Sequence, residues 1–302
     1  ILPSFVDLEQ KEARHALQRS VNALRREIYH LNQLCMDWSA WDDTYEYMVD
    51  RDPEYEASNL VPTSFSENDL HLVYYFDLQG DVIWGKTYGL QFRETAPPSE
   101  FAARSWSPDH RLLAHRNRES SVSGLMMTTQ GPMLIASRPI LPSVGEGEIH
   151  GTLVMGRYLS DAVALAIRDQ AQADLTVWAL DGRELPSAAA SELALLSPEV
   201  PVRLREAEEN QLEAYTTFPD LYGAPALLLR VSLPRDILSR GLIALRLNIL
   251  AVFCAGVFVL LVLIVLMQRT VTRPIAALTR HVTQIGREDE LTAYPGPQSR
   301  DE

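Results

Sequence analysis

An uninterrupted apolar segment near the C-terminal end constrains this chain more than any other feature. Residues 249–267, ILAVFCAGVFVLLVLIVLM, are nineteen consecutive uncharged and almost wholly apolar residues. At a rise of about 1.5 Å per residue, a helix of this length crosses the hydrocarbon core of a bilayer. A buried helix of a globular domain rarely stays apolar on every face for so long. We therefore predict a transmembrane helix over 249–267, with the lipid bilayer as a partner.

The charges that flank this segment do not reveal its orientation. Arg240 and Arg246 precede it, and Arg269, Arg273 and Arg280 follow it. Positive charges gather on the cytoplasmic side of a membrane helix, but these two groups nearly balance. The orientation must therefore come from another feature.

The net charge limits the possible partners. The 302 residues carry a formal net charge of -13, whereas a nucleic-acid-binding surface needs a stripe of lysine and arginine that attracts phosphates. We therefore expect no nucleic-acid partner.

The sequence lacks the motifs of common enzymes and metal sites. Cys35 and Cys254 are the only cysteines, and Cys254 lies inside the predicted span, so the two are not expected to pair. No Cys/His cluster, G-x-S-x-G elbow or P-loop is found. We predict no catalytic residues, no metal and no cofactor in this region.

The N-terminal region has the apolar spacing of a long helix that packs along one seam. Its apolar residues alternate steps of four and three, at Leu17, Val21, Leu24, Ile28, Leu31, Cys35 and Trp38. This heptad seam predicts a helix over residues 1–50. The helix packs either on a second copy or on another face of the same chain, because both arrangements give the same pattern.

The middle of the chain alternates β-rich segments with turn residues. Two β-rich runs flank the turn DLQGD in residues 70–90, which is typical of a hairpin. A helix is expected near 98–115, and three further strands are expected in 123–141 and 149–159. These elements predict a five-stranded sheet in an α+β domain.

A second and smaller sheet is expected before the membrane helix. Residues 160–173 begin with a serine that can cap a helix, and an acid follows in the first turn. Strand and turn patterns follow in 174–185 and 210–234, and Pro234 can start a helix that continues into the span. The predicted fold is α+β: a long N-terminal helix, two antiparallel sheets in tandem and one transmembrane helix.

Residues 37–48, DWSAWDDTYEYM, are unusually rich in aromatic and acidic side chains. A continuous helix would place four large side chains on one face, at Trp38, Trp41, Tyr45 and Met48. Asp42 would border that face, where an unpaired carboxylate is costly to bury, so it needs a partner. Packing alone and ligand binding both remain open for this face.

The two adjacent acids suit ligand binding better than catalysis or metal binding. Neighbouring residues of a helix point about 100 degrees apart, so Asp42 and Asp43 cannot face each other across a substrate. The acids of this segment also lack the regular spacing of a calcium loop. Aromatic walls beside a carboxylate suit a cationic or hydroxyl-bearing ligand. We predict ligand contacts from Trp41, Asp42, Asp43 and Tyr45, with Asp42 more important than Asp43.

Arg138 is a further candidate because it interrupts the apolar run LIASRPIL. A charge in such a segment must find a carboxylate, a carbonyl or a ligand. A salt bridge with Asp42 or Asp77 and recognition of a ligand carboxylate are the two alternatives.

The C-terminal segment resembles the first half of a HAMP linker. RPI follows the span directly at Arg273, and apolar residues continue at helical spacing, at Ile275, Leu278, Val282 and Ile285. HAMP modules are cytoplasmic dimeric relays. The resemblance therefore implies a homodimer, with the region before the span outside the cytoplasm.

The front half resembles the fourth class of CHASE domains, which are extracytoplasmic sensors of bacterial and archaeal signalling receptors. The matching pieces are DWSAWDDTYEYM, the Asn-Leu of EASNL, the hairpin DLQGDVIWG, GPMLIASRPIL and GTLVMGRYL, within residues 30–160. The resemblance implies a PAS-like or Cache-like sensor, in which a long helix leads to a curved antiparallel sheet.

These features divide the chain into six expected segments. They are a signalling helix (1–50), a membrane-distal PAS/Cache-like sensor (51–160), a smaller membrane-proximal sheet (161–233), a helix into the membrane (234–248), the span (249–267) and a partial HAMP linker (268–302).

We expect the ligand-sensing region of a transmembrane receptor in the inner membrane of a bacterium, with 1–248 outside and 268–302 in the cytoplasm. An unidentified small-molecule ligand would shift the helices that enter the membrane. The resemblance implies an output module beyond residue 302, either a cyclic-dinucleotide synthase or phosphodiesterase or a histidine kinase. The alternative is an envelope module that binds another protein and no small molecule.

Overall fold

The structure is a computed structural model, and it describes residues 2–145, 147–207, 210–273 and 275. Its contacts divide the chain into two units, Ile1–Arg235 and Asp236–Glu302. Each unit is described below by itself.

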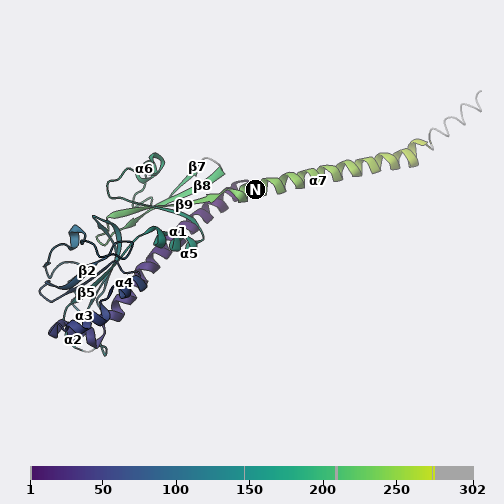
Figure 1. The fold of residues 1–302 in the computed structure, drawn as a ribbon. Coiled ribbons are helices and arrows are strands. Elements are labelled where there is room, and N and C mark those ends of the chain that lie inside the picture. The colour runs from purple at the N-terminus through teal and green to yellow at the C-terminus, as the bar shows by residue number, and fades with distance from the viewer. Residues whose placement is uncertain (1, 146, 208–209, 274, 276–302) are drawn as a thin grey trace, which may run out of the picture. The chain divides into compact units, whose positions relative to one another are not determined.

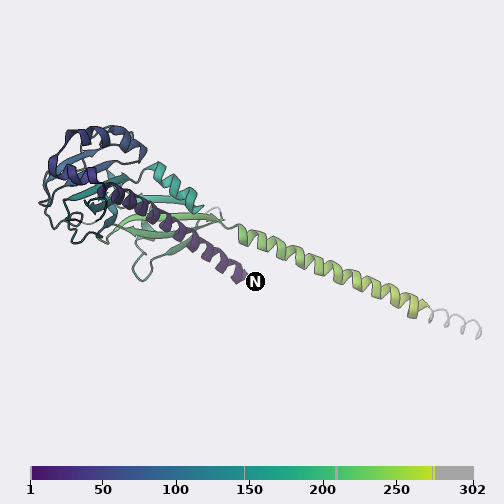
Figure 2. The same ribbon diagram turned by 90° about the horizontal axis from the view of Figure 1, so that it is seen from below.

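Helix α1 (Leu2–Ser39) confirms the long N-terminal helix. It lies along both sheets of the first unit (Figures 1 and 2) and contacts strands of each. A single buried cluster joins Leu31 of α1 to Leu153 and Leu229, one from each sheet. The heptad seam therefore packs within the chain, because the hydrophobic effect places its apolar stripe on the sheets.

The helix ends earlier than the sequence predicts. The chain turns at Ala40, and Trp41 takes an extended backbone with φ -86° and ψ 140°. A separate helix, α2 (Asp42–Asp50), starts directly afterwards. The prediction of one continuous helix through residue 50 is therefore wrong, and so is the single face that it would have given to DWSAWDDTYEYM.

The first sheet has the five antiparallel strands that the sequence predicts. Its strands are β1 (Leu72–Phe76), β2 (Val82–Thr87), β3 (Val122–Thr128), β4 (Gly131–Pro139) and β5 (Thr152–Tyr158). They are arranged in the order β2-β1-β5-β4-β3, and the predicted hairpin at DLQGD joins β1 to β2. Two short helices, α3 (Pro53–Asn59) and α4 (Pro62–Glu67), precede β1.

The helix expected near 98–115 is absent from the structure. Only a single 3₁₀ turn, η1 (Ser99–Phe101), forms there. The segment instead pairs with the edge of the sheet, since the Val82 N–H donates to the Arg104 carbonyl at 2.8 Å. Its apolar residues, among them Phe101 and Leu112, cover the face of the first sheet opposite α1. Contacts with the first sheet thus outweighed the helical pattern of this segment. Pro108 also interrupts that pattern, because proline disfavours a helix interior.

The second sheet has four antiparallel strands in the order β6-β9-β8-β7. Its elements are α5 (Asp161–Ala171), β6 (Asp174–Ala179), α6 (Ser187–Leu193), β7 (Arg203–Ala207), β8 (Gln211–Pro219) and β9 (Pro225–Pro234). The predicted helix is α5, and the Ser160 side chain caps it by accepting from the Val163 N–H at 3.3 Å. The exact domain boundaries at 50 and 160 stay predictions.

The second unit contains helix α7 (Asp236–Met267), followed by a short π-helical segment, η3 (Gln268–Thr272). Ile249–Val271 is long and apolar enough to cross a membrane, and none of its most apolar window is buried within the chain. This finding fits the predicted span. The HAMP-like seam beyond Ile275 lies outside the described residues.

Candidate ligand-binding site

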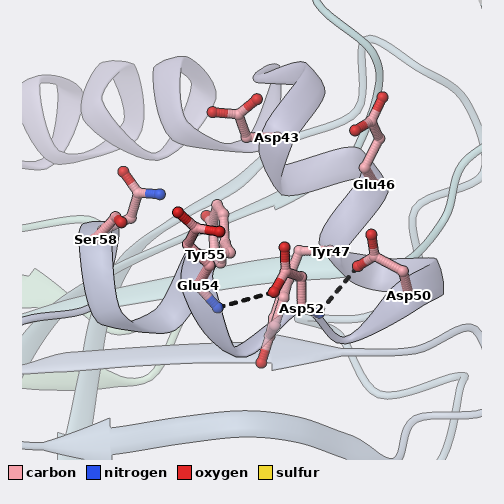
Figure 3. Close-up of a pocket in the computed structure, with 9 residues that line it drawn as sticks. Asp43, Glu46, Tyr47, Asp50, Asp52, Glu54, Tyr55 and Ser58 are labelled. Carbon is pink, nitrogen blue, oxygen red and sulfur yellow. Dashed lines mark hydrogen bonds between the residues drawn. The ribbon is translucent and has the colours of Figure 1, made fainter.

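An acidic cavity of about 280 Å³ lies between α2 and α3 (Figure 3). It is lined by Asp43, Glu46, Tyr47, Asp50, Asp52, Glu54, Tyr55, Ser58 and Asn59. Five of these side chains are carboxylic acids, and no lysine, arginine or histidine is among them. The lining therefore favours a ligand with positive charge.

Local backbone signals bring these acids together. Helix α2 ends at Asp50, and the next residue, Arg51, adopts the left-handed conformation (φ 60°) and turns the chain back. Asp52 then caps α3 by accepting from the Glu54 N–H at 2.9 Å, and Asp50 accepts from the Asp52 N–H at 3.0 Å (Figure 3). The two helices thus form a tight pair with acids on facing turns.

Two tyrosines of the cavity connect it to the first sheet. The rings of Tyr47 and Tyr55 stack with centroids 4.6 Å apart. The Tyr55 hydroxyl lies 2.7 Å from Thr44 Oγ1 and 3.0 Å from the Tyr75 hydroxyl, and Tyr75 belongs to β1. A change in the position of α3 would therefore alter the contacts of β1 in the first sheet.

Burial further favours the uncharged form of these tyrosines. Desolvation raises the pKa of Tyr47, Tyr55 and Tyr75, and the hydrogen bond from Tyr47 to Glu56 raises the pKa of Tyr47 further. The Tyr47 hydroxyl donates to Glu56 Oε1 at 2.7 Å. The cavity thus has a neutral aromatic wall beneath its carboxylates.

Asp42 is not the buried carboxylate that the helical pattern predicts. It is exposed at the first position of α2, where Asp42 Oδ1 accepts from the Ser143 N–H at 2.8 Å. In return, the Asp42 N–H donates to Ser143 Oγ at 3.2 Å. Because the helix breaks at Trp41, Asp42 binds the loop that contains Ser143, whereas its neighbour Asp43 lines the cavity.

The two predicted aromatic contacts also lie outside the cavity lining. Trp41 stacks on Trp38 with ring centroids 5.6 Å apart. Tyr45 stacks on His150 at 3.8 Å, and the Tyr45 hydroxyl lies 2.8 Å from His150 Nε2. Trp41, Asp42 and Tyr45 thus do not line the cavity between α2 and α3, and ligand contacts from them stay a prediction.

Arg138 takes a partner that the sequence did not suggest. Its Nε donates to Asn32 Oδ1 on α1 at 2.9 Å. Within the described residues, no salt bridge joins Arg138 to Asp42 or Asp77. Arg138 lies on the α1 side of β4 and not at the cavity, and a ligand contact there stays a prediction.

Sequence reasoning missed Glu46, Asp50, Asp52 and Glu54 as cavity residues. The signal was present as a high density of acids in DDTYEYMVDRDPEYE, residues 42–56. Without the turn at Arg51, however, the pattern cannot show that these acids face one another. Among the residues that the structure describes, no group of three or more His, Cys, Asp or Glu side chains is placed to hold a metal ion.

The architecture defines the class of protein. A long helix along two antiparallel sheets, with a helix of membrane-spanning length after it in the sequence, is the Cache-like fold that the sequence predicts. The chain belongs to the CHASE4 domain family, whose model matches residues 23–178. The resemblance seen in residues 30–160 is thereby confirmed.

A curated relative extends the similarity through nearly the whole chain. The methanogenesis regulatory histidine kinase FilI of Methanothrix harundinacea (strain 6Ac) is 26% identical over 291 residues, which cover 96% of this chain. The match covers only 32% of that relative, so this chain spans about a third of its length.

Solved structures share the fold of the first unit. The extracellular domain of vpHK1S-Z8, a proposed histidine kinase, matches with a TM-score of 0.53 and 13% identity, covering 78% of this chain and 98% of that one. A domain of a sensory box/GGDEF family protein from Vibrio parahaemolyticus matches with a TM-score of 0.50 and 12% identity, covering 78% and 99%. At these identities the likeness concerns the fold alone.

Together, the family and the membrane helix identify the sensor region of a transmembrane signalling receptor. The receptor is an inner-membrane protein with an extracytoplasmic segment. The partial HAMP linker is still a prediction from the sequence.

Proposed function

We propose that this sensor detects a cationic organic molecule in the cavity between α2 and α3. The observation that carries the proposal is the lining of five carboxylic acids without a basic side chain. Carboxylates held close together repel one another, and a bound ammonium or guanidinium group relieves that repulsion.

Binding would change the balance between two arrangements of the sensor. A ligand that joins acids of α2 to acids of α3 draws the two helices together. It shifts the receptor only if it prefers the closed arrangement, since equal affinity for both states shifts nothing. The hydrogen bond between the Tyr55 and Tyr75 hydroxyls offers a path from α3 to the first sheet.

The first prediction concerns the response to organic cations. With residues 1–302 in lipid nanodiscs, we expect lysine, arginine, putrescine or choline to raise the melting temperature of the sensor. At about 100 times the dissociation constant, binding adds about 2.7 kcal/mol, or roughly 5–10 °C for a unit of this size. Differential scanning calorimetry measures the shift, and glutamate and succinate serve as anionic controls.

Matched variants locate the binding site. Asp43→Asn combined with Glu46→Gln should reduce the shift by more than half, whereas Asp42→Asn should leave it unchanged because Asp42 lies outside the cavity. Equal loss in both variants would place the ligand elsewhere. If none of the cations gives a shift, the alternative of a protein-binding envelope module gains support.

We further propose that the receptor is a homodimer with a histidine kinase as its output module. The relationship to FilI supports the kinase, and the dimer is suggested by the HAMP-like sequence after the span. A diguanylate cyclase or phosphodiesterase output is the alternative. Two parallel spans would place equivalent positions of α7 close together.

The second prediction tests both the homodimer and the histidine kinase output in the full-length receptor in membranes. One cysteine at a time at positions 254–257 covers about one helical turn, with Cys254 native in the first variant and Cys254→Ser in the others, and Cys35→Ala in all of them. We expect oxidation to crosslink at least one of them, and the crosslinked band to take up phosphate from ATP. Phosphate uptake without any crosslink argues against the dimer, and a crosslinked band without phosphate argues against the kinase.

A further inference from the structure

The turn between β8 and β9 reaches from the second sheet to the first. Leu221, in this turn, is only 7% exposed and belongs to the buried cluster on the outer face of the first sheet. Its N–H also donates to the Leu125 carbonyl of β3 at 2.8 Å. A residue of the second sheet's hairpin thus completes the core of the first sheet.

The turn holds Leu221 in a fixed position. Asp220 Oδ1 accepts from the Tyr222 N–H at 2.8 Å and from the Ala224 N–H at 2.9 Å. Gly223 adopts a positive φ of 87°, which a residue with a side chain rarely takes. The turn is therefore preorganised, and the leucine cannot move independently of the hairpin.

The first sheet is shaped to receive this leucine. Gly124 of β3 leaves room for it, since a Cβ at that position would lie 2.6 Å from Leu221 Cδ2. The Arg111 guanidinium, from the segment between β2 and β3, lies 5.8 Å from the centre of the Tyr222 ring. Two elements of the first sheet region therefore contact one turn of the second.

The opposite end of β9 is fixed as well. The Arg235 N–H donates to the Asn210 carbonyl at 2.9 Å. The Arg235 guanidinium pairs with Glu9 of α1 at 3.1 Å and with Glu206 of β7 at 3.1 Å, and Glu9 is only 5% exposed. Arg235 is the residue directly before α7 in the sequence. Strand β9 therefore runs from the core of the first sheet to the start of the membrane helix.

We propose that the β8–β9 turn and strand β9 form a coupling strut, in which Leu221 ties the first sheet to Arg235. A displacement of β3 is passed along β9 because the strand is hydrogen-bonded to β6 and β8 over its length and fixed at both ends. The inference rests on the proposed function in one respect, namely that ligand binding first displaces the first sheet.

The third prediction tests the strut by hydrogen exchange without any ligand. In residues 1–302 in nanodiscs, Leu221→Ala should speed amide exchange at least tenfold along β9 as far as Arg235 and also in β3 and β4. Gly124→Ala should have the same effect from the other side, because its added methyl group displaces Leu221. Mass spectrometry of the exchanged peptides gives the rates.

Two exposed neighbours serve as controls. Ser123→Ala in β3 and Leu195→Ala in the second sheet region should change exchange less than twofold. Acceleration confined to residues 219–225 in both test variants would overturn the strut, because the turn would then only open locally. This test does not depend on the cavity. If exchange accelerates along β9, β3 and β4 but no cation binds, the strut is supported and the proposed ligand is rejected.

Discussion

Leu31→Ala should lower the free energy of unfolding of the sensor unit by about 3–5 kcal/mol, the upper part of the range for a fully buried leucine. Leu31 is 0% exposed in α1 and belongs to the buried cluster that joins the helix to both sheets. Removing its methyl groups leaves a cavity that α1 and the two sheets cannot fill by moving closer to one another. Equilibrium unfolding in denaturant measures the loss.

A residue on the opposite face of the same helix gives the control. Tyr29 is 56% exposed, so Tyr29→Ala should cost less than about 0.5 kcal/mol. If the Leu31→Ala loss disappears as protein concentration rises, the seam packs between copies and the intramolecular arrangement is wrong. A loss independent of concentration supports packing within the chain.

The second large effect should appear on acidification. The His115 imidazole lies between two serine hydroxyls, with Nδ1 at 2.8 Å from Ser120 Oγ and Nε2 at 2.9 Å from Ser137 Oγ. Burial, followed by the charge of Arg138, lowers the pKa of His115 to about 4. An unfolded histidine has a pKa near 6.5, so between these values the unfolded chain binds more protons than the folded one.

Stability should therefore fall as the pH falls from about 6.5 toward 4. With allowance for partial exposure, the loss is about 2–3 kcal/mol. Denaturant unfolding between pH 7.5 and 4.5 measures the slope, which His115→Asn should flatten. Some slope should persist, because burial also lowers the pKa of His71 and of His110.

An exposed histidine on α1 separates this effect from general acid sensitivity. His30→Asn should leave the pH slope of the wild-type sensor unchanged. A His115→Asn variant with the full wild-type slope would show that other groups cause the acid sensitivity.

Three features of this protein could be obtained from the sequence because each is local and periodic. The apolar run predicts the membrane helix, since length and hydrophobicity alone decide whether a helix can span a bilayer. The heptad seam predicts α1, and alternating runs around DLQGD predict the β1–β2 hairpin. The order of the motifs also indicates the family that the match over residues 23–178 confirms.

The candidate site depended on contacts between distant residues. Whether Asp42 or Asp43 lines the cavity between α2 and α3 follows from the helix break at Trp41, which no periodic pattern reveals. Asp42 finds its partner at Ser143, 101 residues further along the chain. The absent helix near 98–115 has the same origin, because Arg104 pairs with the edge of the first sheet.

The sequence by itself thus determined the elements with a regular apolar period, among them α1, the β1–β2 hairpin and the membrane helix, and the tertiary structure decided what the polar residues do. Hydrophobic periodicity is written along each helix or strand, so it can be read one segment at a time. The direction of a carboxylate or a guanidinium depends on a single turn or a distant donor. The acids of α2 and α3 became one cavity only because the chain reverses at Arg51.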